Sequence, residues 1–174
     1  RGDTRWAIPA TCADLGRPRA RAALVNSPSR LHDGGMNRVR GKLILITGAS
    51  SGIGAACARR FAADGANLVL WARRRERLAE LGAELERGHG VAARLAQVDV
   101  RDRAAVNGAT AELVAADQVP DVLLNNAGLA SGLAKIHEGD PDDWDRMIDT
   151  NLKGLLNVTR AILPHMVARR RGHV

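Results

Sequence analysis

Short apolar runs and amphipathic segments alternate along the chain from Lys42 onward. The apolar runs predict four strands, at residues 43–47, 67–72, 91–98 and 122–125. Apolar residues at helical spacing predict the intervening helices, at residues 53–64, 75–87 and 103–116. Strands and helices in this order form a parallel sheet through right-handed crossovers, with helices on both faces. We therefore predict a doubly wound α/β fold, whose ligand crevice lies at the carboxyl ends of the strands.

A longer helix is predicted after a loop at Ala127–Asp140. Pro141 can begin this helix, and apolar residues continue at helical spacing for several turns. Pro164 is expected to kink or end it, and Arg169–Arg171 to form a solvated C-terminal end. The final segment, Gly172–Val174, has the pattern of a glycine turn and the first step of a fifth strand. We therefore expect the domain to be truncated at its C-terminus.

Residues 1–35 differ from the rest of the chain because they show neither alternating nor helical apolar periodicity. Prolines and the pair Gly34-Gly35 interrupt them. We expect a disordered or non-native extension, with the natural start at Met36. A genuine flexible extension is the alternative. The folded domain is expected to span residues 36–174 and to be incomplete at its C-terminus.

The composition suits one folded domain. The chain has 174 residues, of which 45% are hydrophobic, and no stretch resembles a transmembrane span. Cys12 and Cys57 are the only cysteines, too few for a disulfide framework or a structural metal site. We expect a cytoplasmic protein without a bound metal and without a membrane partner.

The formal charge of +7 raises nucleic acid as a candidate partner. The basic residues are nearly all arginines, however, and they are scattered among acidic residues. Six of them, with three aspartates, lie in residues 1–35, outside the predicted fold. Aromatic residues make up only 2% of the chain, which leaves little material for stacking on bases. We therefore expect no nucleic-acid partner.

A glycine-spaced turn joins the first predicted strand to the first helix. Gly48 permits a tight turn with positive φ, Gly52 lets backbone amides approach a ligand, and Gly54 leaves room for the helix to pack on the strand. The helix points its positive end at this turn, as in proteins that bind a diphosphate. A plain strand-to-helix turn is the alternative. The candidate diphosphate-binding residues are Gly48, Ser50, Ser51, Gly52, Ile53 and Gly54.

The end of the second predicted strand bears on which dinucleotide is bound. A carboxylate there would hold a ribose 2′-hydroxyl and repel a 2′-phosphate. The sequence instead has Arg73 and Arg74, whose forked donors suit a phosphate dianion. An exposed helix start is the alternative, although cations are unfavourable at a helix N-terminus. We predict NADP(H) as the cofactor, with NAD less favoured.

Residues 41–174 resemble the short-chain dehydrogenase/reductase family in the order and spacing of four motifs. These are Thr47–Gly54, Asp99-Val100, Asn125–Gly128 and Asp149–Gly154. The resemblance implies a Rossmann fold and hydride transfer between a nicotinamide cofactor and an alcohol or carbonyl. Further segments are similar to those of family members that oxidise serine or 3-hydroxy acids. They are residues 126–130, 143–144, 147–151 and 163–164.

The resemblance also implies roles for individual residues. Asp99, with Val100, would contact adenine, although this segment could instead simply cap the next helix through Asp99 or Asp102. Asn125 and Asn126 end a buried strand, where unpaired backbone groups need partners, and the small pair Ala127-Gly128 would let the cofactor ribose lie against the main chain. An asparagine-rich turn is the alternative. The backbone carbonyl of Asn151 would hold a water in the family's proton relay, so this residue is the catalytic candidate.

The family's catalytic serine and Tyr-x-x-x-Lys motif are absent, and the chain has no tyrosine. Because that tyrosine is the general acid/base, we expect the chain as it stands to be inactive. We interpret it as the cofactor-binding part of an NADP-dependent oxidoreductase acting on a small alcohol or carbonyl. A 3-oxoacyl or general carbonyl reductase, or a non-catalytic nucleotide-binding protein, is the alternative. Related enzymes commonly form dimers or tetramers, which we expect of the full-length protein.

Overall fold

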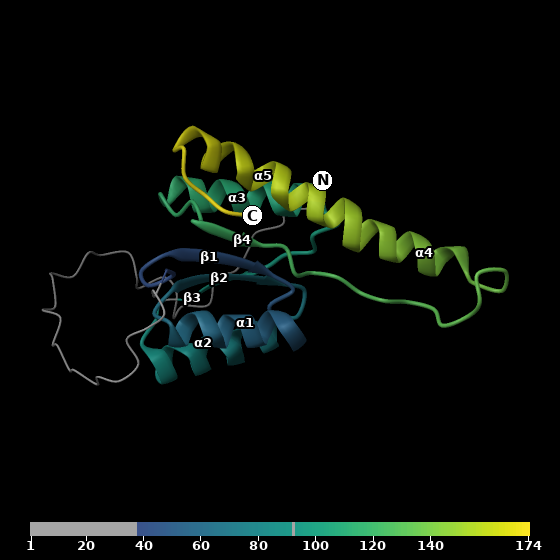
Figure 1. The fold of residues 1–174 in the computed structure, drawn as a ribbon, viewed down its shortest axis with the longest axis horizontal. Coiled ribbons are helices and arrows are strands. Elements are labelled where there is room, and N and C mark those ends of the chain that lie inside the picture. The colour runs from purple at the N-terminus through teal and green to yellow at the C-terminus, as the bar shows by residue number, and fades with distance from the viewer. Residues whose placement is uncertain (1–37, 92) are drawn as a thin grey trace, which may run out of the picture. The chain divides into compact units, whose positions relative to one another are not determined.

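The computed structural model describes residues 38–91 and 93–174, so the predictions for residues 1–35 lie outside the described residues. Four parallel strands form one sheet in the order β3-β2-β1-β4 (Figure 1). They are β1 (Leu43–Thr47), β2 (Asn67–Ala72), β3 (Ala93–Gln97) and β4 (Val122–Leu124). The order reverses between β1 and β4, as in Rossmann-like sheets. The predicted fold class is confirmed.

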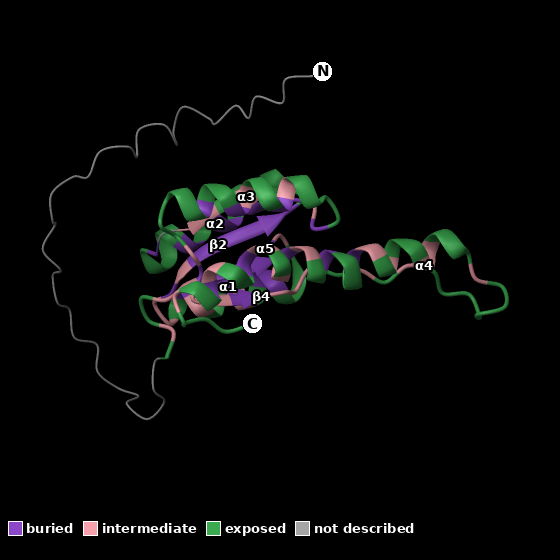
Figure 2. Cartoon of the chain, turned by 90° about the horizontal axis from the view of Figure 1, so that it is seen from above, coloured by how far each residue is buried: buried purple, intermediate pink, exposed green. Residues whose placement is uncertain are grey.

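Two helices cover each face of the sheet (Figure 1). They are α1 (Gly52–Ala63) and α2 (Arg75–His89) on one face, and α3 (Arg103–Ala115) and α5 (Leu155–Ala168) on the other. Side chains along a strand alternate between faces, so Ile44 and Ile46 of β1 pack with α1 and α2, whereas Leu45 packs with α3 and α5. The buried strand β2 lies between these layers (Figure 2).

The four strands and the three helices between them begin and end within two residues of their predicted bounds. The largest difference is in β3, which covers Ala93–Gln97 rather than residues 91–98. It pairs only with β2 within the described part of the chain, so no second neighbour extends it. Helix α2 ends at Gly90, whose φ of +64° gives a left-handed cap. Helix α3 begins at Asp102, whose side chain accepts from the amides of the first turn.

The long helix begins with α4 (Pro141–Ile148), capped by Asp140. It continues through a π-helical turn (Asp149–Gly154) into α5 without leaving helical backbone angles. The expectation that Pro164 could end it is wrong, because α5 runs on to Ala168. Pro164 is exposed, so water can hydrate the carbonyl that lacks its amide partner. Helix α4 buries none of its residues and extends beyond the sheet (Figures 1 and 2).

The residues after α5 return to the sheet beside β4. His173 forms a parallel bridge with Val122, in which Leu123 N donates to His173 O over 2.9 Å. The predicted first step of a fifth strand is therefore present. The prediction of a wholly solvated arginine end is wrong for Arg169. Its guanidinium donates to Val119 O over 2.8 Å and lies 3.5 Å from a carboxylate oxygen of Asp121, which ties the end of α5 to the start of β4.

Candidate functional site

A cleft opens at the carboxyl ends of the strands, where the fold places ligands. Loops after all four strands and the π-helical turn contribute to it. Its lining residues are Gly48, Ser50, Ser51, Ala72, Arg73, Arg74, Val98, Asp99, Val100, Ala127, Gly128 and Thr150. Nine of these were candidate site residues from the sequence, whereas Ala72, Val98 and Thr150 were not. The strand order reverses at this edge, so the cleft lies at the topological switch point of the sheet.

The turn between β1 and α1 has the shape that a diphosphate requires. Gly48 and Gly52 have φ values of +67° and +56°. A Cβ on Gly48 would lie 2.8 Å from Ala127 Cα, and one on Gly54 would lie 2.6 Å from Gly48 O. A Cβ on Gly52 would meet nothing within 4 Å, so its backbone faces open space. The glycines therefore bring two loops together and leave the main chain accessible to a ligand.

The N-terminus of α1 offers donors to an anion at this turn. Its first residues leave backbone amides without intrahelical partners. The N-cap Ser51 makes no side-chain capping bond, and the first turn contains no acidic residue. Both features leave the amides and the positive end of the helix dipole directed at the cleft. The described residues thus fit a diphosphate group.

Arg74 lies over this turn. Its Nε and Nη2 donate to Ser50 Oγ over 3.2 and 3.0 Å, and Nη2 also donates to Ser51 Oγ over 2.5 Å. The neighbouring Arg73 has its backbone carbonyl fixed by Gln97 Nε2 over 2.9 Å. The Arg74 guanidinium and two hydroxyls therefore gather at the end of β2, where Arg73 also lines the cleft and where the ribose of a dinucleotide lies in this fold. Such a set of donors matches a phosphate ester.

Asp99 is held by Arg101 at the end of β3. Arg101 Nε donates to Asp99 Oδ1 over 3.0 Å, Nη2 donates to Oδ2 over 2.6 Å, and the Arg101 amide donates to Oδ1 over 3.0 Å. The bonds from the Arg101 side chain are the main cause that lowers the pKa of Asp99. Asp99 is therefore an ionised acceptor whose orientation is fixed. Of the two expected candidates for the cap of α3, Asp102 is the cap and Asp99 is not.

A buried network holds the loop after β4 against the glycine turn. Thr47 is 1% exposed, and its Oγ1 accepts from the amides of Asn126 and Ala127, each over 3.0 Å. Asn126 Nδ2 donates to Thr47 O over 3.0 Å and to Gly48 O over 3.4 Å. Thr47 and Asn126 position the site although neither was a candidate ligand, and the expectation that Asn126 meets unpaired backbone groups is confirmed. The available signal was a polar residue at the end of each of two neighbouring buried strands.

Five candidates do not line the cleft. Asn125 Nδ2 donates to Thr159 Oγ1 over 2.9 Å, which ties β4 to α5. Asn151 pairs reciprocally with the backbone of Leu129, because its Oδ1 accepts from Leu129 N and its Nδ2 donates to Leu129 O, both over 2.9 Å. Ile53 is 76% exposed in the first turn of α1. Gly52 and Gly54 shape the turn beside the cleft. Ligand roles for these residues stay predictions.

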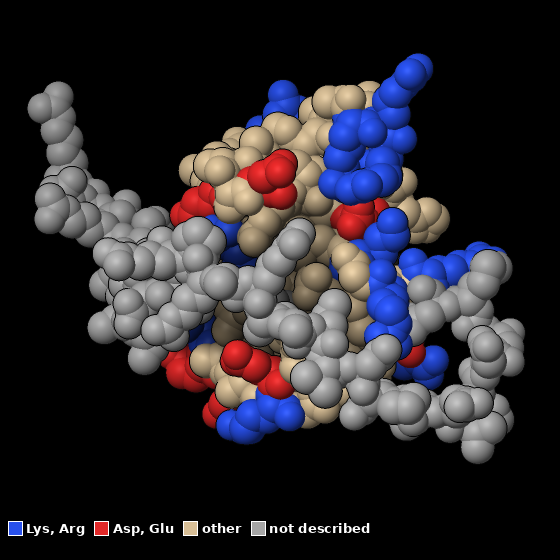
Figure 3. Space-filling model, turned by 90° about the vertical axis from the view of Figure 1, so that its left-hand side faces the viewer, with Lys and Arg blue, Asp and Glu red and all other residues tan. Residues whose placement is uncertain are grey.

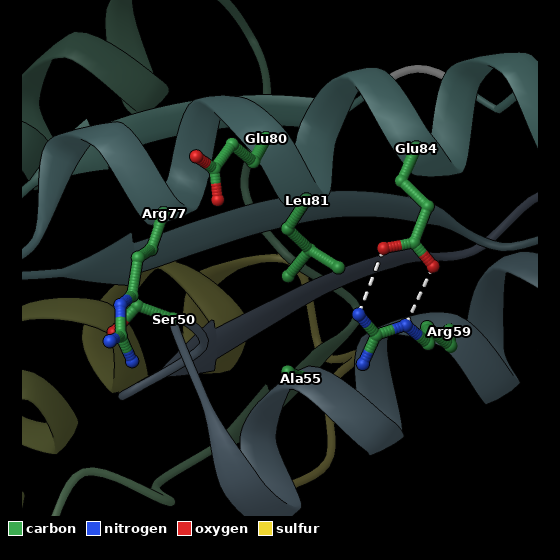
Figure 4. A pocket seen from close by; sticks show the side chains of 7 residues that line it. All are labelled: Ser50, Ala55, Arg59, Arg77, Glu80, Leu81 and Glu84. Atoms are coloured by element: carbon green, nitrogen blue, oxygen red, sulfur yellow. Dashed lines mark hydrogen bonds and ion pairs between the residues drawn. The ribbon is translucent and has the colours of Figure 1, made fainter.

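A larger groove of about 360 Å³ lies between α1 and α2 (Figure 4). The bidentate pair of Arg59 and Glu84 spans it, with distances of 2.7 and 2.8 Å. It shares only Ser50 with the cleft and includes no strand end. Because the glycine turn and the paired arginines belong to the smaller cleft, we take that cleft as the candidate site.

One face of the described part of the chain shows mixed charge (Figure 3). On the face seen in Figure 3, acidic side chains lie between the basic ones. Within residues 38–91 and 93–174, no three His, Cys, Asp or Glu side chains gather as metal ligands would. No helix in the same part of the chain has the length and apolar character needed to span a bilayer.

Comparison with known proteins assigns the chain to a family. Residues 42–174 match the family model for short chain dehydrogenases. The NADP-dependent 3-hydroxy acid dehydrogenase YdfG of Salmonella typhi is 49% identical over 132 residues, which cover 76% of this chain and 52% of that protein. The chain thus spans about half the length of the curated relatives it matches.

Solved structures agree with this assignment. A serine dehydrogenase from Escherichia coli is 46% identical, with a TM-score of 0.70 over 75% of this chain and 59% of that one. A closed form of serine dehydrogenase complexed with NADP+ has the same identity and TM-score, and the match covers 75% of this chain and 51% of that one. The glycine turn at the switch point and the family match over residues 42–174 lead to one conclusion: the chain belongs to the short-chain dehydrogenase family.

Proposed function

We propose that the chain is the NADP(H)-binding part of an oxidoreductase that transfers hydride between the nicotinamide and a small alcohol or carbonyl substrate. The observation that carries the proposal is the position of Arg74, whose guanidinium bonds both serine hydroxyls of the glycine turn. No carboxylate competes at the end of β2. The NADP+ complex of the related serine dehydrogenase supports the same cofactor.

Each part of the cleft has a task in this proposal. The amides at the start of α1 bind the diphosphate, Arg73 and Arg74 bind the 2′-phosphate, and Asp99 accepts from the base. When bound, the cofactor supplies the carbon that gives or accepts hydride. Thr47 and Asn126 keep Ala127-Gly128 against the glycine turn, which leaves a flat main-chain surface for the cofactor. The chain has no tyrosine to move the substrate proton, so we expect it to bind cofactor without turnover.

For the whole protein we propose a 3-hydroxy acid or serine as substrate. The names of the two relatives support this class. A 3-oxoacyl or general carbonyl reductase of the same family is the alternative enzyme, and a non-catalytic nucleotide-binding protein is the alternative outside catalysis. Oxidation of serine or 3-hydroxy acids with NADP+ by the full-length protein supports the first proposal, and reduction of 3-oxoacyl thioesters supports the second. Cofactor binding without turnover of either kind of substrate supports the non-catalytic nucleotide-binding protein.

We also propose that the full-length protein is a cytoplasmic homodimer or homotetramer that associates through the long helix. Large apolar side chains are exposed along it. They are Ile148, Leu152, Leu155, Leu156, Leu163 and Val167. A monomer rarely leaves so many apolar side chains together in water. Light scattering coupled to size exclusion tests the proposal, and a monomer at micromolar concentration would contradict it.

Titration of the full chain with NADPH and NADH tests the cofactor proposal. Arg74→Gln should weaken NADPH binding roughly 10- to 100-fold, because it removes a hydrogen bond to a charged group. NADH binding should stay within about 2-fold, since no 2′-phosphate is present to lose that bond. Arg73→Asp should also lower the preference for NADPH over NADH. Arg60→Gln is the matched control, because Arg60 pairs with Asp64 on the outside of α1. An unchanged NADPH preference in both cleft variants would refute the role of the arginines.

A further inference from the structure

The hydroxyl of Thr150 is buried without a partner. Thr150 is 6% exposed, and no described residue makes a hydrogen bond with its Oγ1. Thr110, in the α-helix α3, shows the usual alternative, because its Oγ1 donates to Val106 O over 2.8 Å. A buried hydroxyl without a partner loses the hydrogen bonds that water gave it. The Thr150 hydroxyl therefore calls for a partner outside the described residues.

The π-helical turn explains the difference between the two threonines. In an α-helix, a threonine hydroxyl can reach the carbonyl four residues earlier, as Thr110 does. Thr150 lies in the turn Asp149–Gly154, where carbonyls pair with amides five residues away and the turn is wider. Its hydroxyl makes no such bond to the backbone. The turn thus leaves one hydroxyl unpaired, and π-helical turns of this kind are frequent at functional sites.

The position of Thr150 identifies the part of the cleft that it borders. Thr150 lines the cleft together with Asp99 and Val100, which follow β3. Gly154, one turn later on the helix, packs so closely on Val100 that a Cβ would lie 2.6 Å from Val100 Cγ2. The π-helical turn therefore lies against the residues after β3. In this fold the ribose lies at the end of β2, and the family resemblance places the base beside Asp99 and Val100, which follow the adjacent strand β3.

We propose that Thr150 Oγ1 donates a hydrogen bond to a ring nitrogen of the adenine of NADP(H), which makes Thr150 a binding residue for the base. This inference rests on the proposed function. The ionised carboxylate of Asp99 can only accept hydrogen bonds. It can therefore accept one from the amino group of adenine but cannot donate one to a ring nitrogen. A hydroxyl supplies the donor that Asp99 lacks. Together the two side chains match an amino group and a neighbouring acceptor, the pattern of an adenine edge.

The test compares Thr150→Val, which keeps the shape and removes the hydroxyl, with Thr150→Ser, which keeps the hydroxyl. Binding of NADPH and of 2′,5′-ADP to the full chain is measured by calorimetry. Loss of one neutral hydrogen bond should weaken both ligands about 3- to 10-fold in Thr150→Val. Thr150→Ser should stay within about 2-fold of the unaltered chain. The effect should be the same for both ligands because 2′,5′-ADP retains the adenosine and lacks the nicotinamide.

The melting temperature separates this role from packing. Valine removes an unpaired hydroxyl, so the ligand-free Thr150→Val chain should melt at or above the temperature of the unaltered chain, while its stabilisation by NADPH should decrease. If the unaltered chain binds no NADPH, the proposed function itself is wrong. If it binds NADPH and Thr150→Val binds equally well, only the role of Thr150 is wrong. If NADPH binding were weakened equally in Thr150→Val and Thr150→Ser, the role of Thr150 would also be wrong, because the hydroxyl would then not contribute to binding.

Discussion

Replacing Thr47 with valine keeps the outline of the side chain and removes one oxygen atom. That oxygen accepts from the amides of Asn126 and Ala127 over 3.0 Å each, in a residue that is 1% exposed. Valine would leave both amides without this acceptor in a closely packed region. An unsatisfied buried group costs about 1–3 kcal/mol, so two should lower the free energy of unfolding by about 2–6 kcal/mol.

Urea unfolding of the full chain at 25 °C, followed by far-ultraviolet circular dichroism, measures this loss. Thr47→Ser is the matched control, because it keeps the oxygen and removes only a methyl group, at a cost of about 1 kcal/mol. Thr47→Val should also weaken NADPH binding, since Ala127 and Gly128 lose their fixed position beside the cleft. If Thr47→Val unfolds at the same urea concentration as Thr47→Ser, the oxygen does not hold the two loops together.

Three further predictions concern the turn, the charges and turnover. Gly54→Ala should lower the melting temperature, because the new Cβ would lie 2.5 Å from Asn126 Nδ2. Gly108→Ala is the control and should not lower it, because a Cβ at residue 108 would have no atom within 4 Å. Arg101 lowers the pKa of Asp99 in the folded chain. The ion pair therefore stabilises the fold fully at pH values above the ordinary aspartate pKa of about 4. This stabilisation is lost as the pH falls through the lowered pKa of Asp99. Arg101→Gln should therefore reduce the urea midpoint at neutral pH but not in strong acid, and an equal difference at both would contradict this. The chain should bind NADPH without oxidising it, and steady absorbance loss at 340 nm with a carbonyl substrate would show otherwise.

Hydrophobic periodicity was enough to predict the fold of the described residues. Strands such as β1 and β2 are buried on both faces, so they appear in the sequence as uninterrupted apolar runs. The stripe formed by Leu78, Leu81 and Leu85 is buried along α2, which is why its period identified a helix. Prediction failed where the sequence carries no periodic signal. The backbone bond of Arg169 depends on Val119, which is far away in the sequence, and the passage of α5 through Pro164 depends on the exposure of that residue to water.

In the candidate site, too, some residues could be predicted from the sequence and others could not. The glycine turn could be predicted because positive φ and close approach both require glycine, and Gly48 shows both. Thr150 could not, because a threonine within a helix has no distinctive pattern, and for Thr47 the only signal was a polar residue at the end of a buried strand. Their importance depends on which backbone amides or cleft walls surround the hydroxyl, and only the three-dimensional structure shows that. Asn125 and Asn151 were noticed for their sequence position, but their side chains tie elements together.

The π-helical turn also fixes the phase between the two halves of the long helix. Each residue of an α-helix contributes about 100° of rotation, and a π-helical turn holds one residue more than an α-helical turn. Deleting a single residue from Asp149–Gly154 would let the turn tighten into an α-helical turn, which would leave α4 and α5 in phase and confine the change to the turn itself. The residues of the turn, Thr150 and Asn151 among them, would lose their present orientation. A deletion in this short stretch would therefore disrupt the cleft wall without altering any residue that lines the phosphate turn.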